Sequence, residues 1–269
     1  MQKTILITGS TDGIGLETAK TLVSQGHHVL IHGRNAEKLK DAEKTLIRIN
    51  EESVNNGSVD CYLCDLSRIP NVIELAEAIT KTHKKLDVLI NNAGVYKTPK
   101  PITVDGLDAR FAVNTIAPYL LTQKLLPHLG SDARVINLSS AAQAPVNIKA
   151  LIGEVKLSDD LEAYSQSKLA ITMWTRTMAL SHKEKGPVFI AVNPGSLLAT
   201  KMVKEGFGMA GHDIRIGADI LIRLALDNEF ADVSGQYFDN DYGKLASPHK
   251  DALDDKKAEQ VVSAIESVF

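Results

Sequence analysis

The chain has 269 residues, of which 44% are hydrophobic and 23% are charged, values that are typical of a soluble globular enzyme and exclude a disordered chain. The formal net charge of −3 gives no reason to expect nucleic acid or an anionic membrane as a partner. No apolar run approaches the roughly 18 to 20 residues of a membrane span, and a strand pattern that begins at Thr4 leaves no room for a signal peptide, so we expect a cytoplasmic protein.

Short β-branched runs alternate with longer amphipathic segments along the chain. The predicted strands are 4–8, 27–32, 58–64, 86–91, 133–138, 187–193 and 235–239. The predicted helices are 13–25, 35–50, 69–84, 103–128, 161–184, 213–227 and 256–268. This alternation predicts βαβ units, and hence an α/β fold with a doubly wound parallel sheet covered by helices on both faces. No repeat or linker divides the sequence, so we expect a single domain over residues 1–269.

Two segments interrupt this alternation, residues 141–160 and residues 196–212. Loops of this length in a compact domain are usually lids or binding loops. Both follow predicted strands, and ligands of an open parallel sheet bind beyond the carboxyl ends of the strands. We therefore expect both segments to border the substrate.

A glycine-rich turn connects the first predicted strand to the first predicted helix. Its sequence is Thr8-Gly9-Ser10-Thr11-Asp12-Gly13-Ile14-Gly15. Glycines let the backbone approach a ligand closely, and the following helix N-terminus offers N–H groups and a positive dipole end to a pyrophosphate. The turn therefore predicts a dinucleotide site, although its G-x-x-x-G-x-G spacing differs from the general G-x-G-x-x-G fingerprint.

Tyr164 and Lys168 are four residues apart in the predicted helix 161–184, so they share one face. A neighbouring cation favours the phenolate and would lower the tyrosine pKa toward the range of a general acid or base. Tyr96 and Lys100 have the same spacing, but Pro99 lies between them, so that pair is not expected on one helix.

Other residue patterns exclude competing chemistry. Cys61 and Cys64 form a C-x-x-C on a predicted strand, where residues three apart face opposite sides, so we expect structural thiols and not a redox pair. The eight histidines show neither a metal-ligand spacing nor a hydrolytic triad, so we expect no metal site.

These motifs together resemble the short-chain dehydrogenase/reductase family over almost the whole chain. The glycine turn resembles the family's T-G-x-x-x-G-I-G, and Tyr164 with Lys168 resembles its Y-x-x-x-K. Further matches are Asn91-Asn92-Ala93-Gly94, Asn114 in Phe111-Ala112-Val113-Asn114-Thr115, Leu138-Ser139-Ser140 and Asn193-Pro194-Gly195. The long interval between Ser140 and Tyr164, together with Tyr164–Ala170 and Ser234–Phe238, resembles the retinol-dehydrogenase-like branch.

The resemblance implies a single-domain Rossmann fold with strand order 3-2-1-4-5-6-7 and a nicotinamide cofactor across the strand ends. It implies that Tyr164 exchanges the proton, that Ser140 binds the substrate oxygen, and that Lys168 holds the nicotinamide ribose. Asn114 would bind a water that links Lys168 to solvent, and Ser139 is the alternative to Ser140. The implied cofactor-binding residues are Gly9, Ser10, Thr11, Gly13, Ile14, Gly15, Arg34, Asn35, Asp65, Leu66, Asn91, Ala93, Gly94, Tyr164, Lys168, Pro194, Gly195, Ser196 and Leu197.

The residues after the second predicted strand bear on the choice of nicotinamide. NAD-selective family members typically carry an acidic residue where this chain has Gly33, and Arg34 could pair with a 2′-phosphate. Asp12 argues the other way, because some NADP-binding relatives have a basic residue there. We expect NADP(H) to be preferred and NAD(H) to be possible.

The expected function is hydride transfer between nicotinamide and a small-molecule carbonyl or alcohol. The alternatives are a catalytically silent NADP-binding regulator and, less in keeping with the chain length, a nucleotide-sugar epimerase or dehydratase. Val95, Tyr96 and the two loops would form the substrate pocket. Thr200 comes one position later than the family's usual threonine, so the sequence does not decide whether it contacts the carboxamide of the nicotinamide. The family commonly pairs helices near 103–128 and 161–184 into homodimers or homotetramers.

Overall fold

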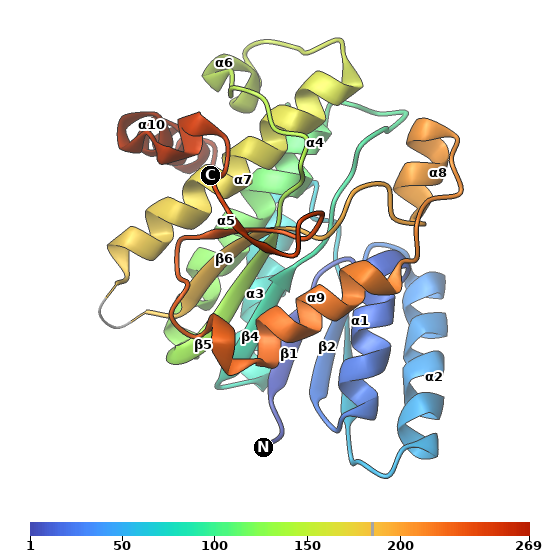
Figure 1. The fold of residues 1–269 in the computed structure, drawn as a ribbon. Coiled ribbons are helices and arrows are strands. Elements are labelled where there is room, and N and C mark those ends of the chain that lie inside the picture. The colour runs from blue at the N-terminus through green and yellow to red at the C-terminus, as the bar shows by residue number, and fades with distance from the viewer. Residues whose placement is uncertain (184–185) are drawn as a thin grey trace.

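One eight-stranded sheet organises the computed structural model, which describes residues 1–183 and 186–269 (Figure 1). Its order is β3-β2-β1-β4-β5-β6-β7-β8, in which all neighbours are parallel except β7 and β8. The predicted order of seven parallel strands is confirmed, and an antiparallel strand is added at one edge. The strands are Thr4–Ile7 (β1), His28–Gly33 (β2), Ser58–Leu63 (β3), Leu86–Asn91 (β4), Leu129–Leu138 (β5), Val188–Asn193 (β6), Tyr237–Asp239 (β7) and Lys244–Ala246 (β8).

Helices cover both faces of the sheet and bury two apolar layers. One layer packs the sheet against Gly13–Ser24 (α1), Ala36–Glu52 (α2) and Arg215–Leu226 (α9) (Figure 1). The other packs it against Ile69–Thr82 (α3), Ala117–Leu125 (α5), Asp160–Ser181 (α7) and Asp255–Glu266 (α10). Shorter elements are Ala109–Phe111 (α4), Ile148–Leu151 (α6), Lys201–Phe207 (α8), the π-helix Ala112–Ile116 and the 3-10 turns Leu126–His128, Asn228–Phe230 and Lys250–Leu253.

The predicted helix 103–128 is wrong in its first turns. Residues 103–108 form an irregular segment, closed by a bridge between Ile102 and Asp108. The helix begins after Asp108, whose carboxylate accepts a 2.8 Å hydrogen bond from the Arg110 N–H. It then widens into a π-helical turn at Ala112–Ile116 before α5 continues it.

The last helix, α10, packs against α7 and reaches α5. Tyr119 of α5 donates a 2.6 Å hydrogen bond to Glu266 of α10, and Arg176 of α7 pairs with Asp255. The two helices expected to pair between copies are therefore covered in part by the chain's own C-terminal helix. A dimer formed on this side would have to include α10.

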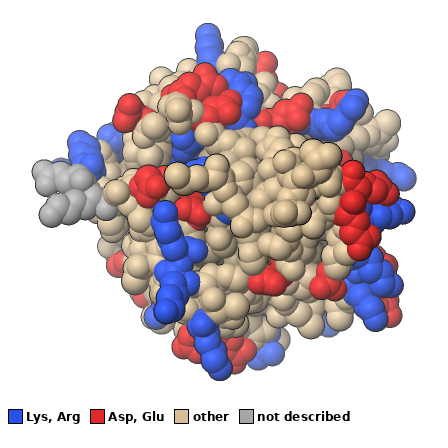
Figure 2. Space-filling view, turned by 90° about the horizontal axis from the view of Figure 1, so that it is seen from below, with Lys and Arg blue, Asp and Glu red and all other residues tan. Residues whose placement is uncertain are grey.

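The surface carries charges of both signs. On the face seen in Figure 2, basic and acidic side chains lie close to one another, and no broad patch of one sign forms. Within the described part of the chain, no helix combines the length and apolar character that a bilayer span needs.

Cys61 and Cys64 lie on opposite faces, as predicted. Cys61 packs with the layer of α1 and α2, whereas Cys64 packs with the layer of α3. Burial raises the pKa of each thiol to about 12. Both are free thiols, and their high pKa values make them poor nucleophiles at neutral pH.

Candidate active site

The glycine turn lies against the loop that follows β4. A Cβ on Gly9, whose φ is +63°, would stand 2.7 Å from the Ala93 Cα, and one on Gly15 would stand 2.5 Å from the Asn92 Nδ2. Gly13 has no such neighbour, since a Cβ there would meet only Thr200 at 4.0 Å. Its side is open, as close approach of a ligand to the backbone requires.

The first turn of α1 suits an anion. Its N-cap residue, Asp12, makes no side-chain capping hydrogen bond, so it leaves the first N–H groups available. The residues around the turn therefore fit the pyrophosphate of a dinucleotide.

His32 lies beneath this turn and was missed by the sequence analysis. Its Nδ1 accepts a 3.0 Å hydrogen bond from the Gly9 N–H, and its Nε2 lies 3.1 Å from the Cys64 carbonyl oxygen. Its backbone N–H donates to the Ser10 Oγ at 2.9 Å. Burial lowers the His32 pKa to about 4, so the ring is neutral and fixes the turn to β2 and β3. The signal available in the sequence was a polar residue directly after the apolar run Val29-Leu30-Ile31.

A side chain at position 33, at the end of β2, would press on Thr11. A Cβ on Gly33 would come within 2.4 Å of the Thr11 Cγ2. Arg34 is exposed and makes no hydrogen bond or ion pair within the described ranges. Asn35 caps α2 by accepting a 2.9 Å hydrogen bond from the Lys38 N–H. The Lys38 Nζ lies 2.8 Å from the Asp12 Oδ2, so a second cation stands beside the turn, neutralising Asp12.

The ends of β3 and β4 supply the next predicted residues. Asp65 is half-buried and accepts a 3.0 Å hydrogen bond from the Ser67 N–H, while Leu66 is buried in the core. The Asn91 side chain points into the interior, where it donates to the Asn137 Oδ1 at 2.8 Å. Asn92, which was not predicted as a site residue, braces the turn instead, donating to the Gly9 carbonyl at 2.9 Å.

Tyr164 and Lys168 lie on one face of α7, close to the end of β5. The Lys168 Nζ is 5.6 Å from the centroid of the Tyr164 ring and donates a 2.6 Å hydrogen bond to the Leu138 carbonyl. Lys168 is only 4% exposed, and burial lowers its pKa to about 7. A Cβ on Gly94 would lie 3.6 Å from the Lys168 Nζ, so the loop after β4 passes directly over the ammonium.

The tyrosine pKa differs from the sequence-based expectation. Burial raises the pKa of the Tyr164 phenol, the hydrogen bond with Ser140 lowers it, and the neighbouring Tyr96 raises it. Lys168 was expected to lower this pKa, but its own charge is disfavoured by burial and its Nζ is directed to the Leu138 carbonyl. In this arrangement Tyr164 holds its proton at neutral pH.

The side chains of the neighbouring residues Ser139 and Ser140 point in opposite directions, as expected for successive residues at the end of a strand. Ser139 is 3% exposed, and its Oγ lies 2.9 Å from the Lys168 carbonyl oxygen and 2.7 Å from the Thr172 Oγ1. Ser140 instead reaches Tyr164 with its side chain. Ser140 is therefore the serine placed to meet a substrate oxygen.

Asn114 sits in the π-helical turn and joins two parts of the site. Its Oδ1 accepts a 2.8 Å hydrogen bond from the Val95 N–H, and its Nδ2 donates to the Val95 carbonyl at 2.9 Å and to the Ser167 Oγ at 3.0 Å. Pro118 lacks the N–H that would reach back to the Asn114 carbonyl. The side chain thus fixes the loop after β4 to α7.

The segment 196–212 contains α8, which was not predicted, and it lies over the site. Thr200 caps α8, accepting a 3.2 Å hydrogen bond from the Val203 N–H, so its hydroxyl has a structural role here. Further along α8, Met202 approaches Gly94, and a Cβ on Gly206 would stand 2.7 Å from the Tyr96 ring. The Tyr96 ring in turn meets the Tyr164 ring edge-on at 5.4 Å.

The turn that leads from β6 toward α8 contains four predicted cofactor residues. Gly195 and Leu197 have φ values of +124° and +52°. Ser196 donates from its N–H to Asp241 at 2.7 Å, and the Pro194 carbonyl accepts a 2.9 Å hydrogen bond from Asn240. Ile14, in the first turn of α1, lies close to Gly217 of α9.

Comparison with known proteins identifies the family. A family model described as short chain dehydrogenase matches residues 3–209. Human retinol dehydrogenase 13 is 31% identical over 277 residues, covering 96% of this chain and 82% of that protein. The chloroplastic short-chain dehydrogenase TIC 32 A of Brassica napus is 31% identical over 281 residues, covering 96% and 86%.

Solved structures show the same fold. A metagenomic short-chain oxidoreductase in complex with NADP has a TM-score of 0.61 and 27% identity, covering 83% of this chain and 90% of that one. A protein from Mycobacterium paratuberculosis has a TM-score of 0.81 and 26% identity, covering 99% and 93%. The chain therefore belongs to the short-chain dehydrogenase family of NAD(P)-dependent oxidoreductases.

Proposed function

We propose that this protein is an NADP(H)-preferring carbonyl reductase or alcohol dehydrogenase that acts on a small molecule. The observation that carries the proposal is the meeting of Tyr164, Ser140 and Lys168 beside Gly94, at the carboxyl ends of β4 and β5. A phenol, a hydroxyl and an amine so placed can bind a carbonyl oxygen and exchange a proton with it. NAD(H) is kept as a possible second cofactor.

The chain's own residues account for the proton. Tyr164, with its raised pKa, holds a proton at neutral pH and donates it to the oxygen of a carbonyl as that carbonyl is reduced. Ser140 donates a hydrogen bond to the same oxygen and stabilises its rising charge. Lys168, with a pKa of about 7, would exchange protons near neutrality, and a water bound at Asn114 would link it to solvent so that the proton can be replaced. When bound, the nicotinamide supplies or accepts the hydride.

The residues around the glycine turn would hold the cofactor. The N–H groups at the start of α1 would bind the pyrophosphate, and Lys168 would hold the nicotinamide ribose. A side chain at position 33 would press on Thr11, and the charge of Lys38 is offset by Asp12, so Arg34 supplies the positive charge at the adenosine end. Its guanidinium would favour the 2′-phosphate of NADP(H).

Substituting the tyrosine tests the function. Tyr164→Phe should abolish NADPH oxidation, followed at 340 nm over a panel of ketones and aldehydes, while NADPH binding measured by calorimetry is retained. If the wild-type protein binds NADPH tightly but turns over nothing on the panel, the alternative of a silent NADP-binding regulator is favoured.

Substituting the arginine tests the cofactor preference. Arg34→Ala should raise the dissociation constant of NADPH by about tenfold or more, because one charge-assisted phosphate contact is lost. The constant for NADH should change little. Equal effects on the two cofactors would refute the role of Arg34. Arg48, which lies in α2 far from the end of β2, provides a control as Arg48→Ala.

The substrate would enter between the loop of residues 141–160 and α8, next to Val95 and Tyr96. Residence in the cytoplasm and assembly into a homodimer or homotetramer are part of the proposal, without nucleic acid or membrane as partner. Light scattering on the full chain tests the assembly, since a mass of 29.2 kDa would mean a single chain.

A further inference from the structure

Two histidines and an aspartate meet on the sheet, remote from the cofactor turn. His28 begins β2, Asp60 lies in the edge strand β3, and His83 caps the end of α3. In the β2–β3 register His28 is opposite Ser58, so Asp60 is its diagonal neighbour. Residues two apart in a strand share one face, so His28 and Asp60 both face α3. The cofactor turn lies at the opposite, carboxyl end of the strands.

Both imidazoles direct Nε2 to the same carboxylate oxygen. The Asp60 Oδ2 lies 3.1 Å from the His28 Nε2 and 3.2 Å from the His83 Nε2. The two rings stand edge-on, with centroids 5.2 Å apart. The Tyr62 hydroxyl is 2.8 Å from the His83 Nε2. The two nitrogens and the carboxylate oxygen lie within 4.8 Å of one another.

This donor set is one that zinc and related transition metals take. Imidazole nitrogen with a carboxylate oxygen suits zinc, whereas magnesium and calcium prefer oxygen ligands alone. Zinc bonds of about 2.0 to 2.1 Å in a tetrahedron put neighbouring ligand atoms about 3.3 Å apart. The two nitrogen–oxygen distances of 3.1 and 3.2 Å are close to this value, and the two nitrogens lie within 4.8 Å of each other, so a metal ion would require the rings to turn from the carboxylate toward a common point.

The cluster is accessible from one side. The side chain of Asp60 is 43% exposed and that of His83 only 10%, so the cluster opens to solvent at the carboxylate and is closed behind.

We propose that His28, Asp60 and His83 bind one zinc ion, or another transition metal of similar preference, with the Tyr62 hydroxyl or a water as fourth ligand. The site ties β2, β3 and α3 together and stabilises the fold at its edge strand. It goes beyond the oxidoreductase function and uses none of its residues. The expectation of no metal site considered only spacing along the chain. These three residues are far apart in the chain and meet through the pairing of β2 with β3 and the end of α3.

Metal titration tests the proposal on the full chain, made without a histidine tag and freed of metal with a chelator. Calorimetry with zinc chloride should give one ion per chain, and zinc should raise Tm, whereas magnesium chloride should do neither. Cobalt(II) should give the intense visible absorption of a four-coordinate site. His28→Gln and His83→Gln should each weaken zinc binding by at least about tenfold.

Two controls make the test decisive. His128→Gln, which alters a histidine outside the cluster, should leave zinc binding unchanged. Asp60→Asn keeps the size of the side chain, so it reports on the site if either histidine variant fails to give a native circular dichroism spectrum. Absence of stoichiometric zinc binding to the wild-type protein, or equal binding by His28→Gln, His83→Gln and Asp60→Asn, would overturn the proposal.

Discussion

Ser139 and Ser140 form a matched pair at the end of β5. Ser139 is buried and hydrogen-bonded to Thr172 and to the Lys168 carbonyl, whereas Ser140 faces Tyr164. Ser140→Ala should lower kcat by about 10²- to 10³-fold, the usual effect of losing one donor to a developing oxyanion. Ser139→Ala should lower stability by about 1 kcal/mol and keep most activity. Urea unfolding and kinetics with a substrate from the panel measure both effects; the reverse pattern would make Ser139 the reactive serine.

The buried ring of His32 predicts a loss of stability in acid. Its pKa is about 4 in the folded chain, against an ordinary value of 6.5. Between these two pH values the unfolded chain binds a proton that the folded chain does not, so stability falls as pH decreases from 6.5 to 4. The slope from this one group approaches about 1.4 kcal/mol per pH unit.

The variant His32→Asn isolates this contribution, because asparagine does not titrate. The free energy of unfolding, measured in urea from pH 4 to pH 7, should fall less steeply in the variant than in the wild-type protein. His27 and His83 also have lowered pKa values, but they are present in both proteins and cancel in the difference. Parallel curves would mean that His32 has the same pKa in the folded and the unfolded chain.

At the scale of elements, α8 is held over the site by its contact with Tyr96. Gly206→Ala improves helix propensity by about 1 kcal/mol, but its Cβ would stand 2.7 Å from the buried Tyr96 ring. Overpacking of this kind costs about 1 to 3 kcal/mol, so the contact outweighs the propensity. We expect faster amide hydrogen exchange in residues 201–206 of the variant.

The control for this prediction is Glu205→Ala, since Glu205 is exposed on the same helix and its replacement adds no atom near Tyr96. Its exchange should match that of the wild-type protein. Slower exchange in Gly206→Ala would show that helix propensity decides and that α8 does not depend on Tyr96.

The elements that the sequence predicted well are those with strong periodicity. The central strands β1 and β4 are mostly apolar because both of their faces are buried. The order of the strands follows from the βαβ pattern. The missed elements α6, α8 and β8 are too short to show a period. No hydrophobic periodicity predicts the π-helical turn at Asn114, because side-chain hydrogen bonds of Asn114 to Val95 and Ser167 hold it in place.

At the scale of the whole molecule, the candidate site was predictable where a motif is local and was missed where it is not. Tyr164 and Lys168 meet because they are one helical turn apart. The support of Gly9 by His32 and the pairing of Lys38 with Asp12 join separate elements, so no spacing in the chain announces them. The packing of α10 on α7 and α5 also joins segments far apart in the chain, so no local pattern in the sequence predicts it.

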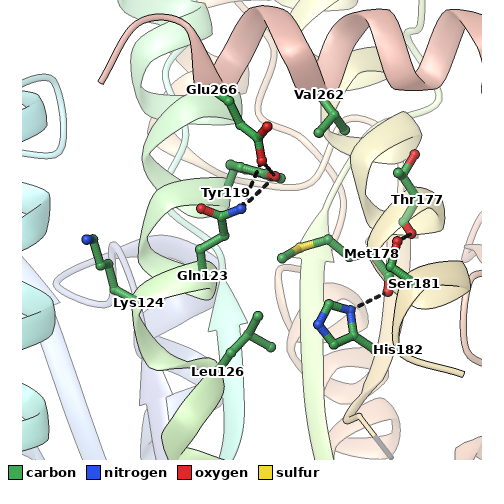
Figure 3. A pocket seen from close by; sticks show the side chains of 10 residues that line it. All are labelled: Tyr119, Gln123, Lys124, Leu126, Thr177, Met178, Ser181, His182, Val262 and Glu266. Atoms are coloured by element: carbon green, nitrogen blue, oxygen red, sulfur yellow. Dashed lines mark hydrogen bonds between the residues drawn. The ribbon is translucent and has the colours of Figure 1, made fainter. Parts of the chain in front are cut away.

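A pocket of about 450 Å³ lies between α5, α7 and α10 (Figure 3). The hydrogen bonds that join α10 to α5 line its upper side in that view. The Tyr119 hydroxyl donates to the Glu266 Oε1 at 2.6 Å, and the Gln123 Nε2 donates to the Tyr119 oxygen at 2.7 Å. Glu266→Ala leaves the hydroxyl of the buried Tyr119 without its acceptor, so we expect a loss of about 1 kcal/mol. For a chain of this size, this loss lowers Tm by about 2 to 4 °C.

A double-mutant cycle separates this hydrogen bond from general effects on α10. In a Tyr119→Phe background there is no hydroxyl left to satisfy, so Glu266→Ala should cost at least about 0.5 kcal/mol less than it does in the wild-type protein. Glu259→Ala, an exposed position on the same helix, should change stability by less than about 0.5 kcal/mol in either background. Urea unfolding of the four proteins gives the coupling energy directly. A coupling energy of zero would mean that α10 is held by its apolar face alone, with Val261 and Ile265 buried against the layer of α7.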